Sequence, residues 1–272
     1  MGTKGSYTGG GGKPGNDLRQ NIEDWLDSLP DLSQPPGDTP PPDQPPDKPD
    51  VPTIRPQLLL PALGLFAPRS GGHADGPGGG GGGSAGGSGG GSRGGAQRSV
   101  ASSSRTAGRA AAAAYALRTG NADLLRQEFG LDYESLRTNP DIADVARQIM
   151  VAACGPLPDG TIEDEEQRVV AAQVAQYVLE ANVDGRPPGP EEIVRETIAC
   201  IIFEAISTET AAKVHAGKRP VWVTAEAERQ LREATQAWAF RVDLSPGGAT
   251  SAEFEKAITQ GIEMMHTIWG TT

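Results

Sequence analysis

Hydrophobic residues recur at helical spacing through the second half of the chain, from residue 121 to residue 272. The pattern predicts helices at 122–129, 132–138, 141–153, 161–181, 191–216, 225–241 and 251–268. Thr161 with Asp164, and Thr250 with Glu253, have the spacing of a capping box. Only the short run Val221–Val223 reads as a strand. We therefore expect an all-α fold, a C-terminal helical bundle with the apolar helix 191–216 at its centre.

A second amphipathic pattern lies near the N-terminus, in residues 16–30. Leu18, Ile22, Trp25 and Leu26 fall on one face of a predicted short helix. A helix of about three turns is marginal on its own in water, so we expect it to fold only against a surface. The four side chains are therefore candidates for docking, either onto the chain's own C-terminal domain or onto a partner. The apolar run at 57–66 is expected to dock as well.

Glycine and proline dominate much of what remains before residue 120. The chain has 37 Gly and 23 Pro, too many in this part for it to bury a core of its own. The predicted organisation is a Gly-rich tail (1–15), a short amphipathic helix (16–30), a disordered Pro- and Gly-rich linker (31–95), a basic Ala-rich helix (96–120) and a helical domain (121–272). A tether of about 100 such residues has a root-mean-square span of about 50–60 Å.

Charge is distributed unevenly along the chain. The net charge of −11 combines −5 in residues 1–50, +6 in residues 51–120 and −12 in residues 121–272. An acidic domain argues against nucleic acid or an anionic membrane as its main partner. Arg98, Arg105 and Arg109 are candidates for contact with a polyanion. The alternative is that this basic helix packs against the acidic domain beside it. In that case the protein contacts nucleic acid only indirectly, through its partners.

No catalytic constellation is visible in the sequence. Cys154 and Cys200 lie in apolar helical contexts, which indicates buried, reduced thiols of a cytoplasmic protein. The acidic run at 163–166 suits a helix N-terminus better than a metal site. No apolar run reaches membrane-spanning length. We therefore expect a protein that is not an enzyme, with no metal site and no bound cofactor.

The first residues, MGTKGSYTGGGG, carry one reactive group. Gly2 permits removal of the initiator methionine, which leaves a free α-amine of pKa near 7.7–8.0 on an unhindered residue. Such an amine is a better nucleophile at neutral pH than a lysine. Two alternatives stand beside this interpretation: an ordinary frayed terminus, and N-myristoylation, because Gly2 and Ser6 fit the M-G-x-x-x-S/T pattern.

Two segments resemble a known family. The start MGTKGSYTGGGG and the stretch MVAACGPLPDGTIEDEEQRVVA at 150–171 are similar to the QatB family, the B component of the Qat antiphage defence system. The ending HTIW of the last helix fits the same family. Lys4 stands where that family usually has a small residue.

The resemblance implies a function and a set of partners. The partners of that family are a P-loop ATPase (QatA), a QueC-like enzyme (QatC) and a TatD-like nuclease (QatD). QueC relatives activate a 7-deazaguanine carboxylate with ATP and then form an amide. The resemblance therefore implies that Gly2 is the amine conjugated to the 7-deazaguanine, with Thr3 and Gly5 contributing to recognition. On this view the rest of the chain is a docking scaffold; the runner-up is a lipid-anchored or nucleic-acid-binding adaptor.

Overall fold

The protein is all-α throughout the part that the structure describes. The computed structural model describes residues 12–29, 53–66, 98–155, 161–183, 186–215, 221–244 and 247–269. Within these ranges the single piece of β-type pairing is an isolated antiparallel bridge between Val183 and Arg186. The predicted fold class is therefore confirmed.

The helices follow the predicted periodicity closely. Their bounds are α1 Gly12–Asp27, the 3₁₀ helix η1 Pro56–Phe66, α2 Val100–Thr119, α3 Ala122–Phe129, α4 Tyr133–Thr138, α5 Ile142–Cys154, α6 Ile162–Glu180, α7 Pro190–Val214, α8 Val221–Ala239 and α9 Ser251–Trp269. Both capping boxes are present. The Thr161 hydroxyl accepts from the amide of Asp164 at 3.1 Å, and the Thr250 hydroxyl accepts from the amide of Glu253 at 3.4 Å.

The start of α8 corrects one prediction. Val221–Val223 forms the first turn of this helix and not a strand, so the helix begins four residues before the predicted residue 225. Three β-branched or aromatic residues are a weak strand signal. Here they are continued by Ala227 and Leu231, which are buried at helical spacing, and α8 packs along α7. Tertiary packing therefore decides the conformation of the run.

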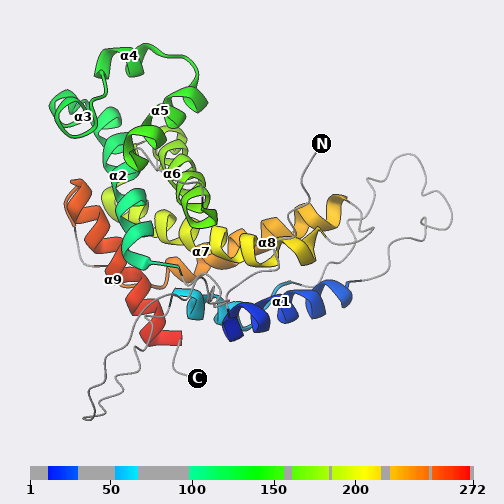
Figure 1. The fold of residues 1–272 in the computed structure, drawn as a ribbon. Helices are drawn as coiled ribbons and strands as arrows, with labels where there is room; N and C mark the ends of the chain where they lie inside the picture. Colours follow the sequence, from blue (N-terminus) through cyan, green and yellow to red (C-terminus); the bar gives the residue numbers. More distant parts are fainter. Residues whose placement is uncertain are drawn as a thin grey trace, which may run out of the picture.

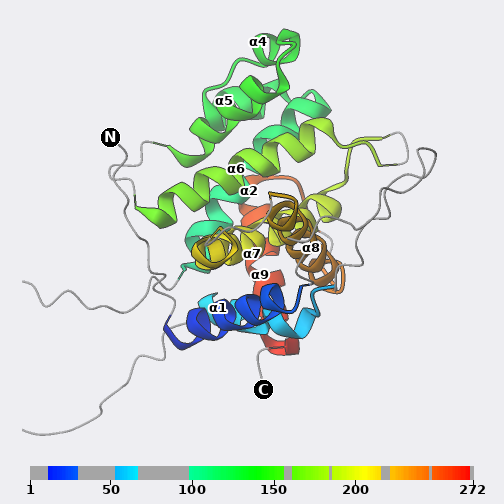
Figure 2. The same cartoon turned by 90° about the vertical axis from the view of Figure 1, so that its right-hand side faces the viewer.

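Helix α2 lies inside the bundle and not beside it. It packs along α9, α6 and α5 (Figures 1 and 2). The alanines at 110–114 are completely buried. Gly108 allows a close approach, because a Cβ at this position would lie 2.8 Å from the backbone nitrogen of Glu255 on α9. The packing therefore has no boundary near residue 120, where the sequence suggested one.

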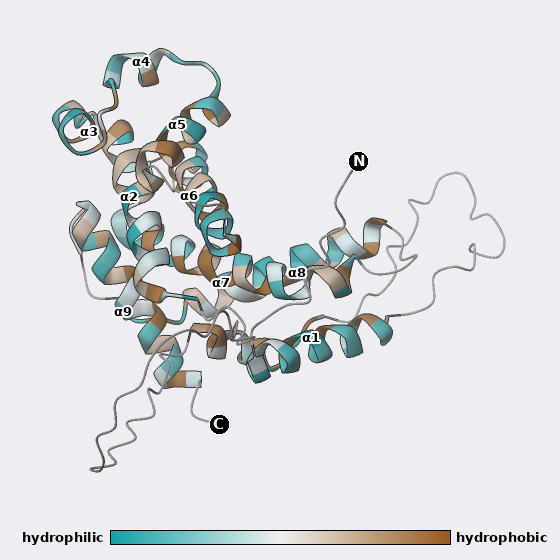
Figure 3. Cartoon of the chain, in the orientation of Figure 1, coloured by the Kyte–Doolittle hydropathy of each residue, from teal (hydrophilic) through white to brown (hydrophobic). Residues whose placement is uncertain are grey.

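Helix α7 is the other central element. It contacts α8, α6, α1 and α9, and most of its length is buried, as expected for the apolar helix 191–216. The layers follow one another from α5 through α6 and α7 to α1 in Figure 2. In Figure 3, α1 carries both hydrophilic and hydrophobic residues, and the buried hydrophobic ones recur every three or four positions, as on one face of an amphipathic helix. Helices α1 and η1, with the residues next to them (12–29 and 53–66), are called the N-terminal lobe below.

Candidate functional site

The N-terminal segment with Gly2, Thr3 and Gly5 lies outside the described residues. What the structure provides is the point at which this segment joins the folded protein. Helix α1 begins at Gly12, earlier than the predicted residue 16. Pro14 lies in its first turn, a position that proline tolerates well because the amide there has no helical partner.

The apolar face of α1 is buried within this chain. Leu18, Ile22, Trp25 and Leu26, the predicted docking residues, are each at most 5% exposed. They pack in the layer formed by α1, η1 and α7. Of the two alternatives left open by the sequence, docking onto the chain's own bundle is the one seen. The apolar run at 57–66 docks in the same layer, as expected.

Polar contacts fix the lobe in register. The side-chain amide of Asn21 donates to the carbonyl of Leu58 at 2.9 Å, which joins α1 to η1. The amide nitrogen of Ile54 donates to Oε1 of Gln230 on α8 at 2.6 Å. At the far end of η1, the carbonyl of Leu65 accepts from the amide of Arg98 at 3.0 Å.

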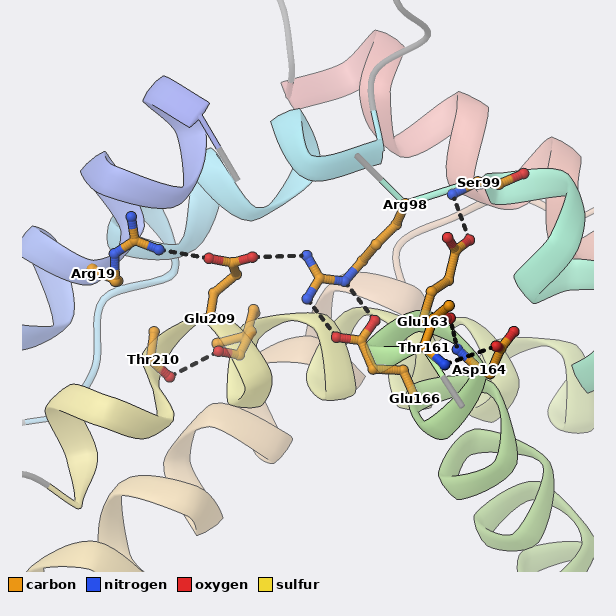
Figure 4. Close-up of polar contacts among 10 residues, drawn as sticks. Arg19, Arg98, Ser99, Thr161, Glu163, Asp164, Glu166, Glu209 and Thr210 are labelled. Atoms are coloured by element: carbon orange, nitrogen blue, oxygen red, sulfur yellow. Dashed lines mark hydrogen bonds and ion pairs between the residues drawn. The ribbon is translucent and has the colours of Figure 1, made fainter. Parts of the chain in front are cut away.

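A chain of ion pairs runs from this lobe into the bundle (Figure 4). Arg19 of α1 contacts Glu209 of α7, with 2.7 Å between Nη1 and Oε2. The other carboxylate oxygen of Glu209 lies 3.2 Å from Nη1 of Arg98. Arg98 in turn holds Glu166 of α6 with two nitrogens, at 2.5 and 2.7 Å. Four charges thus connect α1, α7, α6 and the entry to α2.

The middle of this chain is excluded from water. The side chain of Glu209 is 0% exposed and that of Arg98 is 4% exposed. Burial alone would lower the pKa of Arg98, but the hydrogen bonds and negative charges of Glu166 and Glu209 outweigh it, so that the pKa is raised. The guanidinium therefore stays charged, and removing one member of such a buried pair typically costs about 3–5 kcal/mol.

The acidic first turn of α6 serves the helix N-terminus and the residues before α2. The carboxylate of Asp164 accepts from the amide of Thr161 at 3.0 Å. Hydrogen bonding with the side chain of Thr161, and then with its amide, holds the pKa of Asp164 below its usual value. Oε1 of Glu163 accepts from the amide of Ser99 at 3.2 Å. These contacts agree with the expected capping and dipole role of the run.

The three arginines expected to meet a polyanion have different surroundings. Arg98 is buried, so the prediction is wrong for this residue. Arg109 donates to the carbonyls of Ala153 and Ala152 at 3.0 and 3.2 Å, and its guanidinium carbon lies 5.1 Å from the ring centroid of Phe129. Arg105 has a 66% exposed side chain, 3.5 Å from Glu255. The basic segment is thus used largely for internal contacts.

The two thiols are poor nucleophiles. Both cysteines are free. Cys200 is buried as expected, and burial raises the pKa of its thiol to about 12. Cys154 is half-buried, and burial also raises the pKa of its thiol. The thiolate is the reactive form of cysteine, and a raised pKa leaves little of it at neutral pH. Neither thiol therefore has the low pKa of a catalytic cysteine.

A surface hollow lies next to the start of α1. Its volume is about 450 Å³, and its lining comes from α1, η1 and α9, including Lys13, Asp17, Gln57, His266 and Trp269. Its lining also includes the apolar residues Leu60, Pro61 and Leu63 of η1. Lys13 and Pro14 also line the hollow, so it lies beside the first turn of α1.

The comparisons with known proteins add no relative. Neither the family models, nor the curated proteins, nor the solved structures include a match to this chain. In the part of the chain that the structure describes, no three His, Cys, Asp or Glu side chains are grouped so as to hold a metal ion. Over the same residues, no helix is both long and apolar enough to cross a membrane.

Proposed function

We propose that the protein is a non-enzymatic acceptor and docking protein of a cytoplasmic antiphage defence system of the Qat type. In this role Gly2, after removal of Met1, is the amine that a QueC-like partner conjugates to a 7-deazaguanine. The observation that carries the proposal is the firm anchoring of α1 directly after the Gly-rich start. The Gly-rich segment that carries Gly2 is thereby attached to the bundle, and in this proposal the bundle is the docking scaffold for partners such as the P-loop ATPase and the TatD-like nuclease.

The reaction requires only one group from this chain, the α-amine of Gly2. The partner transfers AMP from ATP to the carboxylate of the deazaguanine, with release of pyrophosphate. The neutral α-amine of Gly2 then attacks the acyl carbon; AMP leaves, the nitrogen loses a proton, and an amide forms. A glycine amine suits this step because its pKa leaves a useful neutral fraction at pH 7 and no side chain obstructs the cleft.

The docked lobe sets how far Gly2 can reach. From the sequence, a tether of about 100 residues was expected to determine this distance. With α1 in place, residues 2–11 alone connect Gly2 to the bundle, and they span at most roughly 35 Å when fully extended. That length is sufficient for a terminal glycine to enter a partner's cleft while the bundle stays outside.

The proposal is tested by the mass of the N-terminal peptide after co-expression with the QueC-like partner. We expect Gly2 to carry the mass of a 7-deazaguanine carboxylate joined through an amide. Gly2→Pro should abolish the adduct, because its amine is secondary and hindered. Gly10→Pro, which introduces the same residue away from the amine, should retain it.

Other outcomes of the same measurement would contradict the proposal. A bare Gly2 amine in cells with an active partner would exclude the acceptor role. A myristoyl group has a different mass and lacks the ultraviolet absorbance of the base, and it would instead favour the lipid-anchored alternative.

A further inference from the structure

Another hollow lies between α7 and α8, two helices that pack along each other (Figures 1 and 2). Its volume is about 250 Å³. Helix α7 contributes Phe203, Ser207 and Ala211 to its wall, which recur every four residues and therefore share one face of the helix. Helix α8 contributes Leu231 and Arg232. Side chains held by two packed helices keep a fixed geometry, which suits a binding site.

Arg232 differs from the other arginines that the structure describes. Its side chain is half-buried, and its guanidinium carbon lies 4.2 Å from the ring centroid of Phe203. Among the described residues it makes no hydrogen bond and no ion pair. Every other described arginine that is buried or half-buried has a carboxylate or carbonyl acceptor: Arg19, Arg98, Arg109, Arg118, Arg168 and Arg195.

The guanidinium of Arg232 is therefore oriented but lacks an acceptor. Stacking on an aromatic ring uses the face of a guanidinium and leaves the N–H groups of its edge available. Glu204 of α7 does not occupy them. Burial and the charge of Glu166 raise the pKa of Glu204 and Arg232 lowers it, but no ion pair joins the two residues. The planar edge of a guanidinium matches the two oxygens of a carboxylate.

Ser207 adds a second polar group to the wall. Its hydroxyl is buried and has no hydrogen-bond partner. Because buried hydroxyls are usually paired, this one points to a partner that enters the hollow. A hydroxyl can donate to an anionic oxygen, as a guanidinium can. Glu228 also lines the hollow, but its carboxylate lies 3.9 Å from Nε2 of His215, so a protonated His215 offsets its charge.

We infer that this hollow is a binding site for a small organic acid. The carboxylate of the ligand accepts from Arg232 and Ser207, and its compact apolar body packs on Val214 and Leu231. The ligand thereby bridges α7 and α8. Since α8 packs chiefly along α7, binding stabilises the attachment of α8 to the bundle. The site rests on the described contacts alone and does not depend on modification of Gly2.

The test is a titration of the full-length protein with isovalerate, a carboxylate with a branched apolar body. We expect the Nε–H signal of Arg232 to shift saturably in NMR spectra, and calorimetry gives the affinity. Isoamylamine, with the same branched body and the opposite charge, should not bind. Arg232→Gln should weaken isovalerate binding at least about tenfold, because charge-assisted hydrogen bonds are lost. Arg241→Gln is the matched control, since it removes the same charge at an exposed position just after α8.

Ser207→Ala should weaken isovalerate binding about threefold, as expected for loss of one hydrogen bond. Circular dichroism checks that each variant keeps its helices. If Arg232→Gln does not, Arg232→Lys takes its place, because it keeps the charge and loses the planar fork, and it too should bind more weakly than the wild type. The site is refuted if the Arg232 signal does not shift saturably, if isoamylamine binds as well as isovalerate, or if the folded Arg232 variant keeps the wild-type affinity.

Discussion

At the scale of residues, the carboxylate of Glu204 has an unfavourable position. It lies on α7, where burial raises its pKa and the negative charge of Glu166 raises it further, while Arg232 and Arg98 act in the opposite direction. The folded protein therefore binds a proton at this site more tightly than the unfolded chain does. The contribution of Glu204 to the free energy of unfolding therefore falls as the pH rises from the pKa of this carboxyl in the unfolded chain through its raised pKa in the folded protein.

Replacing Glu204 by glutamine should relieve this effect. We expect Glu204→Gln to raise the thermal unfolding midpoint by about 1–3 °C at pH 7.5 and to change it much less at pH 4, where the carboxyl is mostly protonated in both states. Calorimetry at the two pH values measures the difference. Glu263→Gln, on the exposed side of α9, is the control and should change little at either pH. An equal shift at both pH values would show that charge is not the cause.

Arg98 shows why the polar part of the site could not be predicted from sequence. In an arginine-rich stretch without acidic residues, its side chain was interpreted as a contact for a polyanion. Its partners Glu166 and Glu209 lie 68 and 111 residues further along the chain. Helical periodicity identifies which face of a helix is buried, but it contains nothing about which distant charges meet. The capping boxes could be predicted because their partners lie only three residues apart in the sequence.

At the scale of elements, α2 depends on small side chains. An alanine run predicts a helix, but it has no apolar stripe and so does not indicate which face is buried. In the structure nearly every side of this helix is covered, and Gly108 brings it against the backbone of α9. The strongly amphipathic helices were placed correctly, whereas the central role of α2 was missed for this reason.

The close approach between α2 and α9 gives a test. Gly108→Ala would place a Cβ 2.8 Å from the backbone nitrogen of Glu255. Because a backbone cannot turn aside as a side chain can, the helices must separate, and we expect a loss of about 1–3 kcal/mol in the free energy of unfolding. Urea denaturation measures it. Ser103→Ala, in the same helix, should stay within about 0.5 kcal/mol of the wild type; a similarly small effect of Gly108→Ala would contradict the packing.

At the scale of the whole molecule, two parts of the chain are assembled across a long intervening segment. The N-terminal lobe (12–29 and 53–66) packs against α7, and the described residues from 98 onward form the bundle. The sequence predicted both parts and the presence of a docking face on α1. The sequence could not predict which surface the apolar face of α1 packs against. The side of α7 that it contacts also carries Glu209, a residue that no local sequence pattern distinguishes.

Shortening the intervening segment should be harmless. Deletion of 76–92 leaves residues 67–75 and 93–97 to join two ends that already meet at Leu65 and Arg98. A shorter loop costs less entropy to close, so we expect stability to be unchanged or higher by up to about 0.7 kcal/mol. Modification of Gly2 should also be retained. Chemical denaturation and the N-terminal mass provide the two readouts, and a destabilised or unmodified deletion variant would contradict this expectation.

The hydrogen bond from Arg98 to Leu65 shows that the two ends of the intervening segment lie side by side in the folded protein. The surfaces of lobe and bundle stay complementary whether the polypeptide between them is long, short or cut. The segment between the lobe and the bundle is therefore a suitable site for inserting another domain. A foreign domain whose own termini lie close together could be placed between residues 67 and 97 without disturbing either part. For the same reason we expect two separately synthesised fragments, 1–66 and 98–272, to associate when they are mixed.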